Sequence, residues 1–81
     1  MYNMCASRVE HGYRYTVTDD AGRILDTRTT ARIYRGAVVA LSEMNERASV
    51  WSWHPTPDAA VSAAATLRRK RPEIVVAAVT S

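Results

Sequence analysis

Hydrophobic and polar residues alternate over residues 9–18, near the start of the chain. The odd positions of this segment carry Val, His and Tyr, and the even positions carry Glu, Gly, Arg and Thr. An alternation with a period of two is typical of a strand with one buried face. Residues 19–22 then have the composition of a tight turn, ending in Gly22, where a left-handed residue is favoured. The pattern predicts a hairpin whose second strand covers residues 23–29.

Two further segments, residues 33–42 and 48–54, also have strand character. The first is the most apolar and lacks clean alternation, which predicts a central strand covered on both faces. A polar stretch over 43–47 has a suitable length for the loop between them. Residues i and i+2 of a strand point to the same face, so we expect Trp51 and Trp53 to lie together. They either fill the core beneath a helix or stand as anchors on an open face.

One helix is predicted between Thr56 and Pro72. Thr56 is a good N-cap and Pro57 suits the first helical position. Asp58 adds a negative charge to the first turn, where the helix dipole favours it. A narrow stripe of apolar residues recurs at helical spacing: Ala60, Val61, Ala64 and Leu67. After Pro72, the apolar residues 73–80 predict a last strand, interior or well covered.

The order of elements is therefore β-β-β-β-α-β, in one domain over residues 9–81. Residues 1–8 show no periodicity and are expected to form a flexible N-terminal arm. The best fit is an α+β fold, with a mainly antiparallel sheet of four to five strands and one helix on one face. A helix of about 14 residues is about 21 Å long, so it covers part of such a sheet. The other face is then free for solvent, a second copy or a partner.

Composition narrows the class of protein. The chain has 81 residues, enough for one domain, and its 47% of hydrophobic residues argues against disorder. Cys5 is the single cysteine, which excludes an internal disulfide and favours a reducing cytoplasm. No apolar run approaches the roughly 18 residues that span a bilayer, and the N-terminus lacks the pattern of a signal peptide. We expect a cytoplasmic protein without a membrane partner.

Residues that could carry chemistry are few and scattered. His11, His54 and Cys5 do not have the spacing of a zinc site. Asp19 and Asp20 are better explained by the turn, because Asp hydrogen-bonds to nearby backbone at turn entries. Three glycines are too scattered to form a phosphate loop, and no serine, histidine and acid follow a hydrolase pattern. We therefore predict a protein that is not an enzyme and holds neither a metal nor a cofactor.

Arginine and aromatic residues are the strongest candidates for a binding surface, because they are enriched in the hot spots of protein interfaces. The candidates are Arg14, Arg28, Arg32, Tyr34, Arg35, Trp51, Trp53 and His54. A basic run, Arg68, Arg69, Lys70 and Arg71, occupies the predicted helix end. These cations either offset the helix dipole or bind phosphates of a nucleic acid. The net charge of +3 is only mildly basic.

Several short motifs resemble a loose group of small accessory proteins encoded by bacteriophages of actinobacteria. They are Asp19-Asp20-Ala21-Gly22-Arg23, Thr27-Arg28-Thr29, the stretch from Arg32 to Val39, Trp53-His54, and Pro57-Asp58-Ala59-Ala60. The resemblance covers roughly residues 13–66. At Arg35-Gly36 this chain departs from the Thr-His that is more frequent in the group. The resemblance implies a protein of the infected cell's cytoplasm that engages host proteins or counters host defence, and it carries over no catalytic residue.

The expected function is therefore that of a non-catalytic, phage-type accessory protein that binds a host protein. Strand addition at a sheet edge, or docking on an open sheet face, needs no special side chains and agrees with the absence of a catalytic motif. The alternative is a small nucleic-acid-binding module that uses the Arg-rich strands and the basic helix end. A homodimer formed through the sheet face or an edge is compatible with either.

Overall fold

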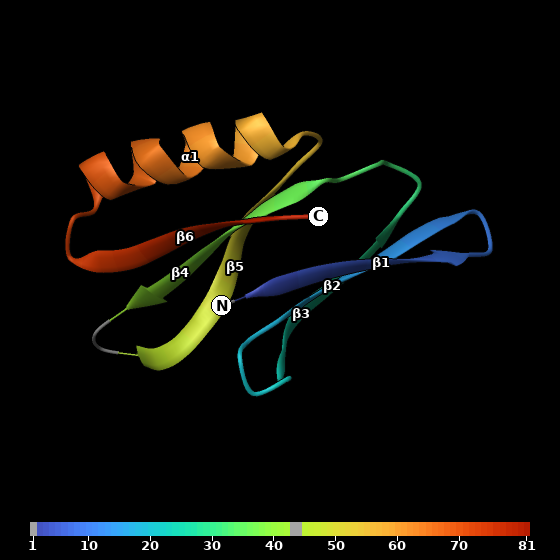
Figure 1. The fold of residues 1–81 in the computed structure, drawn as a ribbon, viewed down its shortest axis with the longest axis horizontal. Helices are drawn as coiled ribbons and strands as arrows, with labels where there is room; N and C mark the ends of the chain where they lie inside the picture. The colour runs from blue at the N-terminus through green and yellow to red at the C-terminus, as the bar shows by residue number, and fades with distance from the viewer. Residues whose placement is uncertain (1, 43–44) are drawn as a thin grey trace.

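A computed structural model describes residues 2–42 and 45–81 of the chain. In this part the fold is α+β, as predicted, with two antiparallel sheets and one helix (Figure 1). The elements are β1 (Asn3–Val9), β2 (Gly12–Thr18), β3 (Ile24–Thr30), β4 (Gly36–Ser42), β5 (Asn45–His54), α1 (Pro57–Lys70) and β6 (Ile74–Thr80). Strands β1-β2-β3 form the N-terminal sheet, and β5-β4-β6, in that order, form the central sheet. Of the predicted loop over 43–47, residues 43 and 44 lie outside the described residues.

The predicted turn after residue 18 is confirmed. Gly22 has φ +81°, and its N–H donates to the carbonyl of Asp19 at 3.1 Å. The Asp19 carboxylate accepts from the backbone N–H groups of Ala21 and Arg23, both at 2.9 Å. Local side-chain hydrogen bonds of this kind are why Asp is favoured at turn entries. The turn joins β2 to β3 as expected.

The expected flexible arm over residues 1–8 is not what the structure has, because Asn3–Val9 forms strand β1. It pairs with β2 from Asn3 opposite Thr18 to Val9 opposite Gly12. The reversal lies at Glu10 and His11, and His11 has φ 66°. Backbone pairing needs no side-chain alternation, so a strand of this kind leaves a weak sequence signal. The predicted strand over 9–18 is therefore the second strand of a hairpin, shortened at its start.

The central sheet holds the most buried residues of the chain. Its middle strand is β4, whose residues 37–40 are all buried, in agreement with the predicted central strand. Val38 and Ala40 pack toward Ala64 and Leu67 of α1. The Thr56 hydroxyl caps α1 by accepting from the Ala59 N–H at 3.1 Å. The helix thus begins and ends where the sequence predicted.

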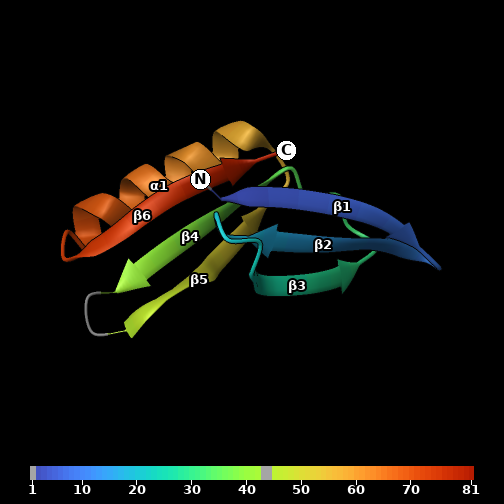
Figure 2. The same cartoon turned by 60° about the horizontal axis from the view of Figure 1, so that its bottom comes forward.

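The other face of the central sheet packs against the N-terminal sheet. Val39 of β4 and Val79 of β6 belong to one buried cluster with Met4, Tyr15 and Val17. This corrects two expectations: one sheet of four to five strands is replaced by two sheets of three, and the face opposite the helix is largely covered by the chain itself. The physical reason is that β1 completes a layer wide enough to bury that face. Figure 2 shows the two sheets meeting, with α1 on the remaining side of the central sheet.

The segment between the two sheets is held by one buried tyrosine. The Tyr15 hydroxyl donates to the Arg32 carbonyl at 2.8 Å and accepts from the Tyr34 N–H at 3.0 Å. A buried hydroxyl that satisfies two backbone groups fixes the path of the chain as it leaves β3 and enters β4.

No helix in the described part of the chain is long and apolar enough to cross a membrane.

Strand β6 is an edge strand, although an interior or well-covered strand was predicted. It pairs only with β4 among the described strands. Val76 and Val79 are buried from opposite faces, but Val75 is 64% exposed. A strongly apolar composition shows that both faces of a strand are partly covered. It does not show whether a second strand pairs alongside.

Candidate functional site

Two of the aromatic residues predicted to contact a partner belong to the core. Tyr34 is 8% exposed and Trp53 is half-buried. Their rings lie 6.2 Å apart, and each lies within 6.3 Å of the Tyr15 ring. The Arg28 guanidinium lies 5.5 Å from the centre of the Tyr34 ring, a distance typical of a cation–π contact. Tyr34 and Trp53 therefore hold the two sheets together and are not available as anchors.

The two tryptophans do not share a face, contrary to the prediction. In the pairing of β5 with β4, Val50 lies opposite Val39 and Ser52 lies opposite Val38, so Trp51 is an extra residue. This is a β-bulge, which breaks the alternation of side chains along a strand. Trp53 packs toward the N-terminal sheet, whereas Trp51 lies on the helix side and is 54% exposed.

Beside Trp51 there is a groove between β5 and the C-terminal half of α1, with a volume of about 600 Å³. We call it the Trp51 groove. Its lining residues are Trp51, Ser52, Ala63, Thr66, Leu67, Lys70 and Arg71. Trp51, Ala63 and Leu67 provide apolar surface, and Lys70 and Arg71 provide positive charge. In the described part of the chain, no acidic residue lines this groove.

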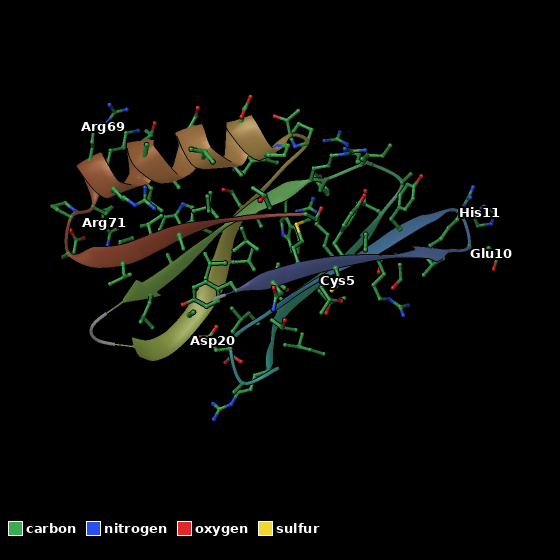
Figure 3. All side chains as sticks on the ribbon, viewed as in Figure 1. Cys5, Glu10, His11, Asp20, Arg69 and Arg71 are labelled. Carbon is green, nitrogen blue, oxygen red and sulfur yellow. The ribbon has the colours of Figure 1, made fainter. Side chains whose placement is uncertain are left out.

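The basic run at the helix end is divided between different contacts. Arg68 donates from Nε and Nη2 to the Val76 carbonyl, at 3.2 and 2.9 Å. Arg71 donates its backbone N–H to the Leu67 carbonyl at 2.8 Å, and its guanidinium hydrogen-bonds to Glu73. That bond holds the pKa of the exposed Glu73 carboxyl below its ordinary value. Arg69 and Arg71 lie at the C-terminal end of α1 in Figure 3. The side chains of the run thus have different partners within the fold.

The arginines predicted as one partner surface are spread over several parts of the fold. Arg14 projects from the outer face of the N-terminal sheet, since its neighbours Tyr13 and Tyr15 face inward. Arg32 and Arg35 lie in the exposed segment between the sheets, where the Arg35 N–H donates to the His54 carbonyl at 3.0 Å. Arg14 and these two arginines thus come from different elements of the fold.

His54 and Ser52 form a pair of the kind that catalytic sites use. Ser52 Oγ and His54 Nε2 are 2.7 Å apart, both half-buried on β5. A serine nucleophile also needs an acid that orients the histidine. Among the described residues no acidic side chain hydrogen-bonds to His54, and no three potential metal ligands lie together. The contact links two side chains at the end of β5 that leads into α1.

A second cavity, of about 650 Å³, lies between the β2–β3 turn and the ends of β4 and β5. Its lining includes Ile24, Leu25 and Leu41, with Asp19 and Arg23 as the charged residues. The Asp19 carboxylate is occupied by the turn hydrogen bonds described above. Among the described lining residues of this cavity the two charges have opposite sign, whereas those of the Trp51 groove are both positive. The Trp51 groove is the better candidate.

Comparison with known proteins adds no relative: no protein-family model, no curated protein and no solved structure matches the chain.

Sequence reasoning identified Trp51, Lys70 and Arg71 separately, but assigned them to different surfaces. The structure brings them together in the Trp51 groove, with Ala63, Thr66 and Leu67 as additional lining residues. The spacing of the helical residues indicates part of this grouping, because residues 63, 66, 67 and 70 share one face of an α-helix. Nothing in the local sequence of β5 indicates the bulge that turns Trp51 toward this face.

Proposed function

We propose that this chain is a non-catalytic binding protein that binds an acidic surface of a partner protein at the Trp51 groove. The observation that carries the proposal is the exposed Trp51 side chain beside Lys70 and Arg71. Tryptophan and arginine are enriched in interface hot spots, and complementary charge selects the partner and speeds association. The resemblance to phage accessory proteins makes a host protein the first partner to test.

Trp51 lies on β5, an edge strand of the central sheet, and this location supports the proposal. A partner that contacts Trp51 also meets the unpaired side of β5, so main-chain contacts can add to those of the side chains. We assign the role expected of an open sheet face to this edge, because both faces of the central sheet are largely covered. The remaining uncovered face, on the N-terminal sheet, is polar and rich in threonine: Ser7, Arg14, Thr16, Thr27 and Thr29. It has no comparable apolar anchor.

A nucleic-acid strand is the second candidate, since bases stack on exposed aromatic rings and phosphates bind nearby cations. The same residues, Trp51, Lys70 and Arg71, favour it. The two candidates differ in salt dependence. Binding of nucleic acid weakens steeply with salt, in proportion to the number of phosphates neutralised.

Affinity capture from host lysate, with and without nuclease, tests the proposal. Three forms of the bait are compared: the parent chain, Trp51→Ala and Ile33→Ala. Ile33 is 57% exposed and lies outside the groove, so its variant controls for the loss of exposed apolar surface. We expect one acidic protein to be captured by the parent and the Ile33 variant after nuclease treatment, and to be lost with Trp51→Ala. Recovery of nuclease-sensitive material alone would favour the second candidate.

A further inference from the structure

The Trp51 groove has two chemically different ends. Along α1 its lining residues run from Ala63 to Lys70, which is about 10 Å at 1.5 Å per residue, and Arg71 follows at the C-cap. The apolar Ala63 lies at one end and Leu67 in the middle, with Trp51 across from the helix. Lys70 and Arg71 lie at the other end. A ligand that fills the groove must therefore be apolar in one part and negatively charged in another.

The number of cations in the groove limits the kind of ligand. Of the four basic residues at the helix end, only Lys70 and Arg71 line it. Arg68 is bound to the Val76 carbonyl, and part of the Arg71 charge is offset by Glu73. A nucleic-acid strand carries one charge per nucleotide and binds along an extended basic track. This groove offers a single cationic end, which suits one or two carboxylates.

We infer that the Trp51 groove binds a short acidic protein segment in a defined order: a large apolar side chain on Trp51, Ala63 and Leu67, followed by carboxylates at Lys70 and Arg71. This inference rests on the proposed function and names the partner's chemistry. The volume of about 600 Å³ lies within the range of pockets that bury small ligands, so it accommodates such a segment only in part. Ser52 and Thr66 also line the groove, where the Ser52 hydroxyl hydrogen-bonds with His54 and the Thr66 hydroxyl accepts from Arg69.

Fluorescence anisotropy with labelled octapeptides tests the inference. The main probe has one leucine and, three and four positions later, two glutamates, in a background of glycine and serine. Matched probes replace the leucine by serine, or the glutamates by glutamine or lysine, and an octamer of thymidine replaces the peptide. We expect the leucine–glutamate peptide to bind at least about tenfold more tightly than the other peptides and the oligonucleotide.

Charge reversal at the groove provides the decisive comparison. Lys70→Glu is expected to weaken binding of the leucine–glutamate peptide by about tenfold or more and to strengthen binding of its lysine counterpart. Arg14→Glu changes the net charge equally but lies on the N-terminal sheet, and it is expected to leave both affinities within about twofold. Circular dichroism of each variant confirms that it is folded.

Several outcomes would overturn the inference. Equal effects of the Lys70 and Arg14 variants would show a general charge effect, and preferential binding of the oligonucleotide would indicate a nucleic-acid site. The capture experiment separates this failure from failure of the proposed function. If Trp51→Ala abolishes capture of a partner protein and Lys70→Glu does not, the proposed function stands and the acidic segment is wrong.

Discussion

Strands β5 and β6 are the two edge strands of the central sheet, and they differ in the regularity of their pairing with β4. Strand β6 pairs with β4 in continuous register from Ile74 to Thr80, without a bulge, and has no charged residue. Strand β5 pairs with the other side of β4, and a bulge at Trp51 interrupts its register. One edge is flat and apolar, whereas the other is bent and carries an exposed tryptophan.

The comparison concerns how each edge strand exposes its backbone groups to other chains. A long, flat, apolar edge strand can pair with other chains. On β6, Arg68 of α1 binds the Val76 carbonyl with two N–H groups, so this backbone acceptor is occupied. On β5, the bulge disturbs the template for strand pairing and turns Trp51 outward. On the first edge one backbone acceptor is occupied by an arginine, and on the second a bulge interrupts the regular pairing.

The largest expected effect separates the two tryptophans of β5. Trp53→Ala removes a ring from the aromatic core and is expected to destabilise the protein by about 3 kcal/mol. Trp51→Ala removes an exposed ring and is expected to cost less than about 1 kcal/mol. Urea denaturation measures both. If Trp53→Ala does not fold, Trp53→Phe keeps part of the packing and preserves the comparison. Equal losses at the two positions would mean that Trp51 belongs to the core.

The next effect concerns the protected edge. Arg68→Ala frees the Val76 carbonyl and is expected to make the protein self-associate as its concentration rises, with a loss of stability of about 1 kcal/mol. Sedimentation velocity over a concentration series measures the association. Arg69→Ala is the matched control, since it removes the same charge from the same helix turn and the Arg69 guanidinium hydrogen-bonds to Thr66 within α1. Identical sedimentation of the two variants would show that Arg68 does not prevent self-association through the β6 edge.

Deletion of Trp51 tests the bulge itself. Without this residue, Val50 and Ser52 become neighbours opposite Val39 and Val38, so the register of β4 with β5 becomes continuous from Gly36 to Leu41. We expect the fold to be retained, with a change in stability of no more than about 1 kcal/mol, and binding at the groove to be lost. Amide NMR spectra show whether the fold is retained, and urea denaturation measures the change in stability. An unfolded deletion variant would instead make the bulge a requirement of the fold.

The smallest expected effect is electrostatic and lies at the end of α1. The hydrogen bond from Arg71 lowers the pKa of Glu73 in the folded protein. A carboxyl whose folded pKa is below its unfolded pKa stabilises the protein above the unfolded pKa, and this contribution is lost as the pH falls through the folded pKa. Arg71→Ala is expected to raise the Glu73 pKa toward its ordinary value in an NMR titration. Lys70→Ala should leave it unchanged, and a shift of equal size there would contradict the assignment.

Sequence-based predictions were accurate for features that depend on residues close together in the chain, and less accurate for features that depend on residues far apart. The turn at Asp19, the cap at Thr56 and the buried strand around Val38 were correct. Each depends on residues within a few positions, or on an apolar run that has to be covered. The chemistry of the lining residues was also visible, since Trp51, Lys70 and Arg71 were all named as candidates.

The sequence by itself therefore determined the local elements and the residue types available for binding. The tertiary structure alone decided that Asn3–Val9 is a strand, that six strands in the described part form two sheets, and that the tryptophans face opposite ways. Strand pairing is made by backbone groups that all residues share, and a bulge exists only relative to a neighbouring strand. For that reason, the joining of Trp51 with the end of α1 in one groove is a property of the packed molecule.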